Sequence, residues 1–351
     1  MTILIILITV LFLAIAGIVY YVIKLNSEIS KTSERLSSIP NYGKPIEDLG
    51  TEVFKLKEDI LGSYEAMRAI ETRIESLALS NQAPEKTEEM FIFFSDPHPF
   101  TSMDSVKWSR NTQLERMKEH LDVSGSDFIL CGGDWLTDHN KETGIEDLKL
   151  AERKMQEMFG DRYYPMVGNH DNNDKIDEIP HETIVDIMFS RWGKAYYSFM
   201  GDTTRFYVFD SDSIPHIAMD DYKKEQAKWF LESLSVNDDK HIAIAIHMCQ
   251  IMDDGGPISS EQAIQLSEIA NAYNNRTSYD GYDFSGKIGK VHVILAGHWH
   301  QDNDYILNNI PVYIIDDAQE GNFDMVLMDY ESNELRALRV GTGNGRIIKL
   351  A

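Results

Sequence analysis

From residue 90 onward, short apolar runs rich in β-branched and aromatic residues recur along the chain. They are MFIFF (90–94), DFILC (127–131), YYPMV (163–167), YYSFM (196–200), RFYVF (205–209), HIAIAI (241–246), VHVILA (291–296), PVYII (311–315) and MVLMD (325–329). Runs of this length and composition are typical of buried β-strands. Helical stretches separate the early runs, whereas the later runs follow one another closely. The pattern therefore predicts an α/β domain with a mixed sheet or two packed sheets, flanked by helices.

Side chains that bind metals follow five of these runs directly, in the segments FFSDPHP, LCGGDW, VGNHD, IAIHM and AGHWH. An open sheet places its ligands outside the carboxyl ends of its strands, so these segments are expected to converge. Each segment alone also fits an ordinary loop, a helix cap or a buried imidazole. Five in succession favour one shared site, with the candidate residues Asp96, His98, Asp134, Asn169, His170, Asp171, His247, His298 and His300.

The candidate ligands offer carboxylate, amide and imidazole groups, and no cysteine is among them. Such a set suits Mn, Fe, Zn or Co ions. Seven ligands exceed one coordination sphere, and a carboxylate can bridge two ions. We therefore expect two divalent metal ions, held by Asp96, His98, Asp134, Asn169, His247, His298 and His300. Glycines precede three of these ligands and would allow sharp turns and close backbone approach.

The order of the motifs, Asp-x-His, Gly-Asp, Gly-Asn-His-Asp, His and Gly-His-x-His, resembles the calcineurin-like metallophosphoesterase superfamily over about residues 90–330. The resemblance implies two packed mixed β-sheets flanked by helices. It also implies an enzyme that hydrolyses a phosphomonoester or phosphodiester by means of metal-activated water. A phosphate ester is thus the expected substrate.

The resemblance further assigns a role to each motif residue. One ion would be held by Asp96, His98 and His300, and the other by Asn169, His247 and His298, with Asp134 bridging both. His170 would contact the phosphate and help the leaving oxygen depart, and Asp171 would orient the His170 ring. Two departures leave the subfamily open: Thr137 stands where purple acid phosphatases have a tyrosine, and Ile246 precedes His247 where many bacterial members have a second histidine.

The chain is strongly acidic, with 33 Lys and Arg against 57 Asp and Glu and a net charge of -24, most of it after residue 80. Such a surface repels nucleic-acid backbones unless metal ions reverse the local sign. Nucleic acid is therefore a disfavoured partner, although a metal-dependent nuclease remains an alternative. Cys131 and Cys249 each end an apolar run and are expected to be buried free thiols.

The first residues predict a membrane anchor, because no charged residue occurs between Ile3 and Ile23. At the helical rise this run matches a hydrocarbon thickness of about 30 Å. A cleaved signal peptide is disfavoured by the length of the run and by the lack of a preceding Lys or Arg. We expect a single-pass anchor within residues 1–25, and the positive charges that follow it place the main domain on the cytoplasmic side.

Residues 26–80 form a predicted helical stalk. Between residues 51 and 79, apolar side chains recur at alternating steps of three and four, interrupted only by Ser63. This seam predicts a coiled coil and hence a homo-oligomer, but a single amphipathic helix docked on its own domain explains it equally well. Residues 81–89 read as a polar linker, and residues 90–351 as the metallophosphoesterase domain. A catalytically silent, membrane-tethered scaffold with the same fold remains the alternative to an enzyme.

Overall fold

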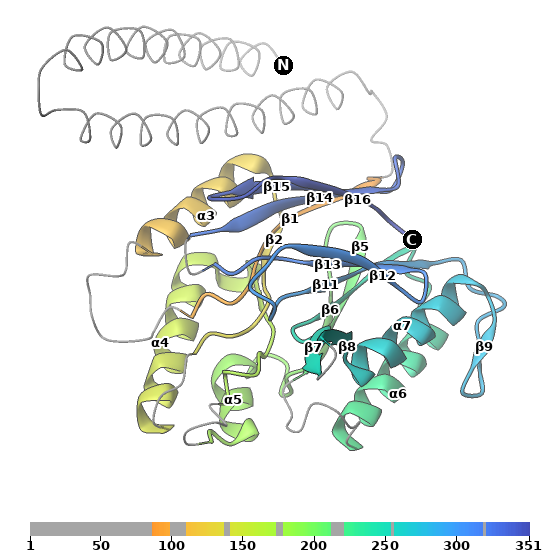
Figure 1. Ribbon diagram of the computed structural model, residues 1–351, viewed down its shortest axis with the longest axis horizontal. Helices are drawn as coiled ribbons and strands as arrows, with labels where there is room; N and C mark the ends of the chain where they lie inside the picture. Colours follow the sequence, from red (N-terminus) through yellow and green to blue (C-terminus); the bar gives the residue numbers. More distant parts are fainter. Residues whose placement is uncertain are drawn as a thin grey trace, which may run out of the picture. The chain divides into compact units, whose positions relative to one another are not determined.

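Two six-stranded mixed sheets form the framework that positions the site (Figure 1). The computed structural model describes residues 86–98, 110–136, 141–172, 178–211, 221–253, 256–318 and 321–351. In spatial order the first sheet consists of β16 (Arg346–Lys349), β15 (Glu334–Val340), β14 (Phe323–Asp329), β1 (Glu88–Phe94), β2 (Phe128–Cys131) and β3 (Tyr163–Pro165). The second sheet consists of β12 (Asn303–Leu307), β13 (Ile310–Ile314), β11 (Lys290–Ala296), β6 (His241–Ile246), β5 (Thr204–Phe209) and β4 (Tyr197–Met200).

Strand direction brings the predicted ligand segments to the same edge. In the first sheet β1, β2 and β3 run parallel, and in the second sheet β5, β6, β11 and β13 run parallel. The strands β14, β15, β16, β4 and β12 pair antiparallel with their neighbours. Because parallel neighbours end at a common edge, the loops after β1, β2 and β3 meet, as do those after β6 and β11. The predicted α/β fold with two mixed sheets is confirmed.

One hydrophobic core joins the two sheets face to face. The ring of Phe91 in β1 lies 5.3 Å from that of Phe206 in β5 and 5.1 Å from that of Phe128 in β2. All three side chains are buried, and burial of such a side chain contributes roughly 1.5–3 kcal/mol. Side chains from β6, β11 and β13 extend the same core. The relative position of the two strand edges is thus fixed by close packing of large rings.

Helices cover the outer faces of this sandwich. On one side are α3 (Arg110–Ser124) and α4 (Lys141–Phe159), and α5 (His181–Met188) contacts α4. Helix α4 buries Leu148, Ala151, Met155 and Phe159, whose spacing places them on a single helix face. On the other side α6 (Asp221–Val236) and α7 (Glu261–Asn274) lie beside the second sheet (Figure 1). A 3₁₀ helix (Gly160–Arg162) precedes β3.

The predicted strands all form, and several further strands were not predicted. These are the hairpin β7 (Gln250–Asp253) and β8 (Gly256–Ser259), the hairpin β9 (Ser278–Tyr279) and β10 (Tyr282–Asp283), and the strands β12, β15 and β16. Strand β1 begins at Glu88, two residues before the apolar run that predicted it. Cys131 and Cys249 are buried free thiols, as expected.

The predicted N-terminal elements lie outside the described residues. This applies to the membrane span at residues 3–23, to the seam at residues 51–79 and to linker residues 81–85. Within the described ranges, which begin at residue 86, no helix has the length and apolar character needed to cross a membrane.

Candidate metal centre

The predicted ligands converge where the carboxyl edges of the two sheets meet. The loops after β1, β2 and β3 contribute from the first sheet, and the loops after β6 and β11 contribute from the second. Main-chain hydrogen bonds connect these loops: the Asp96 N–H donates to Gly133 O (3.0 Å), and the His98 N–H donates to Asp134 O (3.2 Å). In the second sheet the Gly297 N–H donates to His247 O (3.2 Å). The His298 N–H donates to Asp96 Oδ2 (2.9 Å) between the two sheets, so the loops form one connected layer.

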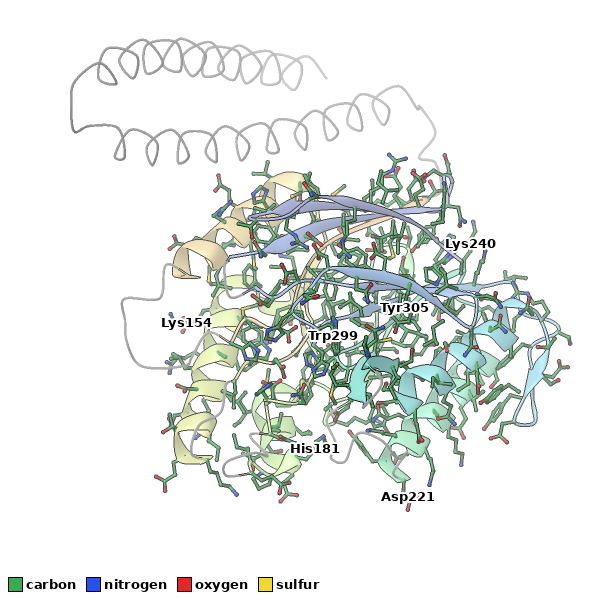
Figure 2. The ribbon with its side chains drawn as sticks, viewed as in Figure 1. Lys154, His181, Asp221, Lys240, Trp299 and Tyr305 are labelled. Atoms are coloured by element: carbon green, nitrogen blue, oxygen red, sulfur yellow. The ribbon has the colours of Figure 1, made fainter. Side chains whose placement is uncertain are left out.

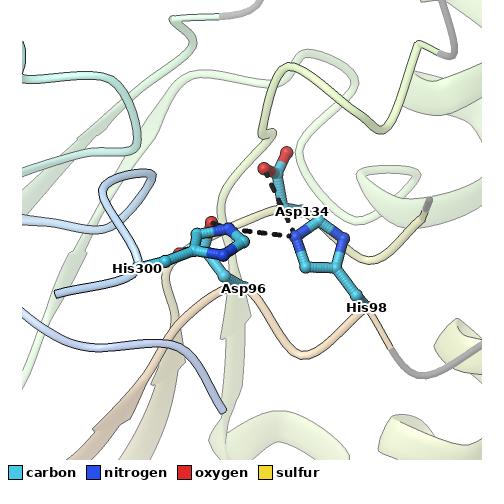
Figure 3. Close-up of side chains that lie close together, drawn as sticks. All are labelled: Asp96, His98, Asp134 and His300. Carbon is cyan, nitrogen blue, oxygen red and sulfur yellow. Dashed lines mark hydrogen bonds and ion pairs between the residues drawn. The ribbon is translucent and has the colours of Figure 1, made fainter. Parts of the chain in front are cut away.

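A first group of potential ligand atoms comes from Asp96, His98, Asp134 and His300, which lie within 4.8 Å of one another (Figure 3). His98 Nε2 lies 3.3 Å from His300 Nε2 and 3.9 Å from Asp134 Oδ2. His300 Nε2 lies 3.2 Å from Asp96 Oδ1. Two imidazole nitrogens and two carboxylates thus face a common point.

A second group shares Asp134 with the first and adds His247 and His298. His247 Nε2 lies 3.1 Å from Asp134 Oδ2 and 3.2 Å from Asn169 Oδ1. The rings of His247 and His298 have centroids 5.2 Å apart. The structure therefore brings together all seven predicted ligands in two overlapping groups, and Asp134 lies between them.

Hydrogen bonds behind two of the rings fix which nitrogen faces the centre. His98 Nδ1 lies 2.5 Å from Leu136 O, and His247 Nδ1 lies 2.5 Å from Gly132 O. A carbonyl only accepts, so each Nδ1 carries the donated hydrogen, and Nε2 is the nitrogen that faces the centre, where a neutral ring would offer its lone pair. This arrangement is typical of histidines that bind metals.

The donor set fits divalent cations. With neutral rings, Asp96 Oδ1 and Asp134 Oδ2 are buried and have no hydrogen-bond donor among the described residues. Their neighbours are imidazole nitrogens with lone pairs, so acceptors face acceptors. A buried acceptor without a donor costs roughly 1–3 kcal/mol. A cation at this point would satisfy these atoms, and oxygen and imidazole donors suit Mn, Fe, Zn or Co ions.

Five of the ligands have left-handed backbone conformations although none is glycine. The φ angles are 52° at Asp96, 35° at His98, 60° at Asp134, 73° at His298 and 49° at His300. Glycine is required before two of the ligands for two different reasons. Gly133 has a φ of +99°, whereas Gly168 lies so close to Asp134 that a Cβ would overlap it. Small residues next to strained ligands let the loops pack against one another.

The electrostatics of the group depend on Asp134. Burial disfavours its charged form, but the nearby His247, His98 and His170 rings outweigh burial and hold the pKa of Asp134 well below its usual range. Although burial opposes it, the attraction of Asp134 and Asp96 raises the pKa of His247 to about 9. Burial lowers the pKa of His98. A cation would have to displace a proton from His247, so metal binding is expected to release protons.

His170 and Asp171 lie in the same loop but make different contacts. The backbone N–H of His170 donates to Asp134 Oδ1 (2.8 Å), and its ring lies 5.2 Å from the His98 ring. Asp171 was predicted to orient the His170 ring, but its carboxylate is hydrogen-bonded to the main chain. The Asp171 carboxylate accepts N–H bonds from Gly168 (2.8 Å), Trp135 (2.6 Å), Leu136 (3.1 Å) and Asp134 (3.2 Å). Asp171 therefore fixes the loop that carries Asp134.

Two carboxylates that pair with histidines, one of them beside the ligand His300, were not predicted. Asp317 Oδ2 lies 3.4 Å from His300 Nδ1, and Asp210 Oδ2 lies 2.6 Å from His181 Nε2. Both follow predicted strands, so the rule that found the other candidates would have included them. Trp299, between the two histidines of the last motif, is partly buried and packs against the apolar residues that the second sheet shares with α6 and α7 (labelled in Figure 2). Thr137 lies outside the described residues.

The chain resembles known proteins in its sequence and in its fold. The model of the calcineurin-like phosphoesterase family matches residues 90–302, more than half of the chain. A dimetal phosphatase from Danio rerio has 12% sequence identity and a TM-score of 0.54. The matched region comprises 75% of this chain and 99% of the Danio rerio chain. A purple acid phosphatase from seeds of yellow lupin (Lupinus luteus) has 12% sequence identity and a TM-score of 0.49. The matched region comprises 76% of this chain and 54% of the lupin chain.

At such low identity the likeness to the Danio rerio protein concerns the fold alone. No curated protein matches the chain in sequence. The family match rests on the segment that contains every candidate ligand, from Asp96 to His300. The chain belongs to the calcineurin-like phosphoesterase family.

Proposed function

We propose that this chain is a dinuclear metal-dependent phosphoesterase that hydrolyses a phosphomonoester or a phosphodiester. The observation that carries the proposal is the pair of overlapping ligand groups that share Asp134. One cation would be held by Asp96, His98 and His300, and the second by Asn169, His247 and His298. Asp134 would contact both, because its Oδ2 lies 3.9 Å from His98 Nε2 in one group and 3.1 Å from His247 Nε2 in the other.

Two divalent cations in this position would supply a water nucleophile near neutral pH and would neutralise charge that develops on phosphoryl oxygens. The residues of the chain provide the rest. Asp171 holds the Asp134 loop, and the carbonyls of Gly132 and Leu136 keep the Nε2 atoms of His247 and His98 directed inward. The ligands are thus oriented before a substrate arrives, which lowers the cost of reorganisation during the reaction.

His170 is the proposed proton donor. Its main chain is bonded to Asp134, its ring borders His98, and its side chain is half-buried at the surface of the centre. From there a protonated imidazole could contact a phosphoryl oxygen and give its proton to the leaving oxygen. The acidic surface of the domain does not prevent binding of an anionic ester, since the cations would set the local field.

Hydrolysis assays with the full chain in detergent would test this proposal. The chain is stripped of metal, titrated with Mn²⁺, and assayed with a chromogenic phosphomonoester and a chromogenic phosphodiester. Turnover should appear with metal and should fall sharply in Asp134→Asn, which loses the shared charge. The preferred ester would define the substrate class. Metal binding without hydrolysis of either ester would instead favour a scaffold, and cleavage of DNA or RNA alone would favour a nuclease.

We also propose that residues 3–23 anchor the chain in a membrane, with the catalytic domain on the cytoplasmic side and with residues 51–79 joining chains as a coiled coil. Support comes from the uncharged run, from the positive charges after it and from the apolar seam. The full chain should stay with membranes after alkaline washing, whereas a chain without residues 1–25 should not. Chemical cross-linking should yield oligomers that disappear when charges replace apolar seam residues.

A further inference from the structure

His300 differs from the other inward-facing histidines in how its ring is held. The side chains of His98 and His247 are 3% and 0% exposed, so close packing restricts them. The His300 side chain is 38% exposed, so close packing restricts its ring less. Its Nε2 faces Asp96 and His98, as Figure 3 shows, and the opposite nitrogen faces a carboxylate, Asp317.

Asp317 is itself attached to the loop that carries Asp96. Ser95 and Asp317 form an isolated parallel bridge, and the Ala318 N–H donates to Ser95 O (2.9 Å). Ser95 is the residue directly before Asp96. The backbone that bears Asp317 is therefore bonded to the first ligand loop, so that Asp317 and Asp96 lie on opposite sides of the His300 ring.

A buried arginine connects the other ends of these loops. Arg339, in β15, is 1% exposed, and its Nη2 donates to Asp302 Oδ1 (2.6 Å), two residues after His300. The same oxygen of Asp302 accepts the Asp316 N–H (3.1 Å), directly before Asp317. Arg339 Nε also donates to the buried Asp324 (2.6 Å). One guanidinium thus holds both the segment after His300 and the segment before Asp317.

From these contacts we infer that Asp317 is a positioning residue for His300 in the metal centre, and that Arg339 keeps the two loops in register. The inference rests on the proposed function. A carboxylate behind a ligating imidazole fixes the ring and makes it a stronger donor, and loss of such a partner typically weakens metal binding by about 10–100-fold. His98 and His247 have carbonyl partners, so of these three rings His300 is the one with a carboxylate behind it.

The test measures metal affinity of the full chain in detergent, by competition with a chelator for Co²⁺ and Mn²⁺. Asp317→Ala should weaken binding of the ion that Asp96, His98 and His300 would hold by about 10–100-fold, with either metal. Asp317→Asn, which keeps the size and an acceptor oxygen but loses the charge, should lie between Asp317→Ala and wild type. The matched control is Asp239→Asn, because Asp239 is similarly buried and ion-paired, but with Arg205 (3.2 Å) at the other end of the sheet.

A double-mutant cycle separates positioning from a general loss of structure. If Asp317 acts through His300, then Asp317→Ala should cost little further affinity in a His300→Ala background. The visible spectrum of the Co²⁺-loaded chain should change in Asp317→Ala, while the melting temperature of the metal-free chain changes no more than in Asp239→Asn.

Wild-type affinity and an unchanged cobalt spectrum in Asp317→Ala would overturn the inference while leaving the proposed function intact. Additive losses in the double mutant would overturn it as well, since they would show that Asp317 acts independently of His300. A wild-type chain that binds neither ion would overturn both the inference and the proposed function.

Discussion

At the scale of single residues, the candidate ligands combine backbone strain with fixed side-chain orientation. A left-handed conformation at a residue other than glycine costs of order 1–3 kcal/mol, and five ligands adopt one. Cross-loop hydrogen bonds, such as that from the Asp96 N–H to Gly133 O, compensate part of this cost. The strained positions thus belong to the loops that present the ligands.

Replacement of His170 should affect chemistry more than metal binding. Its ring borders His98 but is not among the ligands, so His170→Ala should keep the metal content and lower kcat by roughly 10²–10⁴-fold. The loss should be largest for esters with a poor leaving group, which need a proton most. Steady-state kinetics with a series of substituted phenyl esters would measure this. An equal loss across the series would contradict the role of His170 as proton donor.

His292 should make the fold sensitive to acid. It is 5% exposed, and burial, with the neighbouring His241 and Lys290, lowers its pKa to about 3. Its ring packs beside that of Tyr330, and its Nε2 lies 3.0 Å from His241 Nδ1. The unfolded chain, with a histidine pKa of about 6.5, takes up the proton first, so stability falls as the pH drops below that value.

This dependence predicts a specific difference between wild type and His292→Gln. Between pH 7.5 and pH 5 the wild type should lose about 2 kcal/mol of unfolding free energy through this residue, and the variant should not. Urea unfolding at the two pH values would measure both. Identical pH dependence in the two proteins would show that His292 is not held neutral by the fold.

At the scale of elements, strand β15 presents two arginines in contrasting environments. Arg339 is 1% exposed and bonded to Asp324 and Asp302, whereas Arg336 is 48% exposed and pairs with Glu334. Arg339→Ala should destabilise the fold by about 3–5 kcal/mol, because it leaves buried carboxylates without a partner. Arg336→Ala should cost at most about 1 kcal/mol. Denaturant unfolding of both variants would decide, and equal costs would contradict the account of the buried cluster.

The strands with continuous apolar runs could be predicted from the sequence, whereas β12, β15 and β16 could not. Runs such as HIAIAI are apolar throughout because β6 is covered on both faces, and this produces a strong pattern. In β15 and in β12 more buried and less buried positions alternate, so neither strand forms a continuous apolar run. Their place in the fold depends on partners distant in sequence, β14 and β13, which no local pattern specifies.

The same distinction applies to the site. The ligands were predictable because each follows a strongly apolar strand, and parallel strands end at a common edge. The contacts of Asp171 with the main chain of residues 134–136 depend on loop conformation, which residue types alone do not give. Asp317 follows a predicted strand, but its pairing with His300 arises from the tertiary arrangement of two loops.

At the scale of the whole molecule, the proposed centre depends on the packing of the two sheets. The first sheet supplies Asp96, His98, Asp134 and Asn169, and the second supplies His247, His298 and His300. Neither sheet holds a complete set for either ion as proposed, because Asp134 and His98 come from one side and His300 and His247 from the other. Metal binding should therefore stabilise the association of the sheets and the fold as a whole.

The most direct test of the central claim is electron paramagnetic resonance of the full chain loaded with Mn²⁺ to saturation. Two ions that share Asp134 should be close enough to couple magnetically. The account predicts a coupled Mn²⁺ pair in the wild type, and loss of that coupling in Asp134→Asn. A signal from isolated Mn²⁺ ions alone in the saturated wild type would contradict a dinuclear centre.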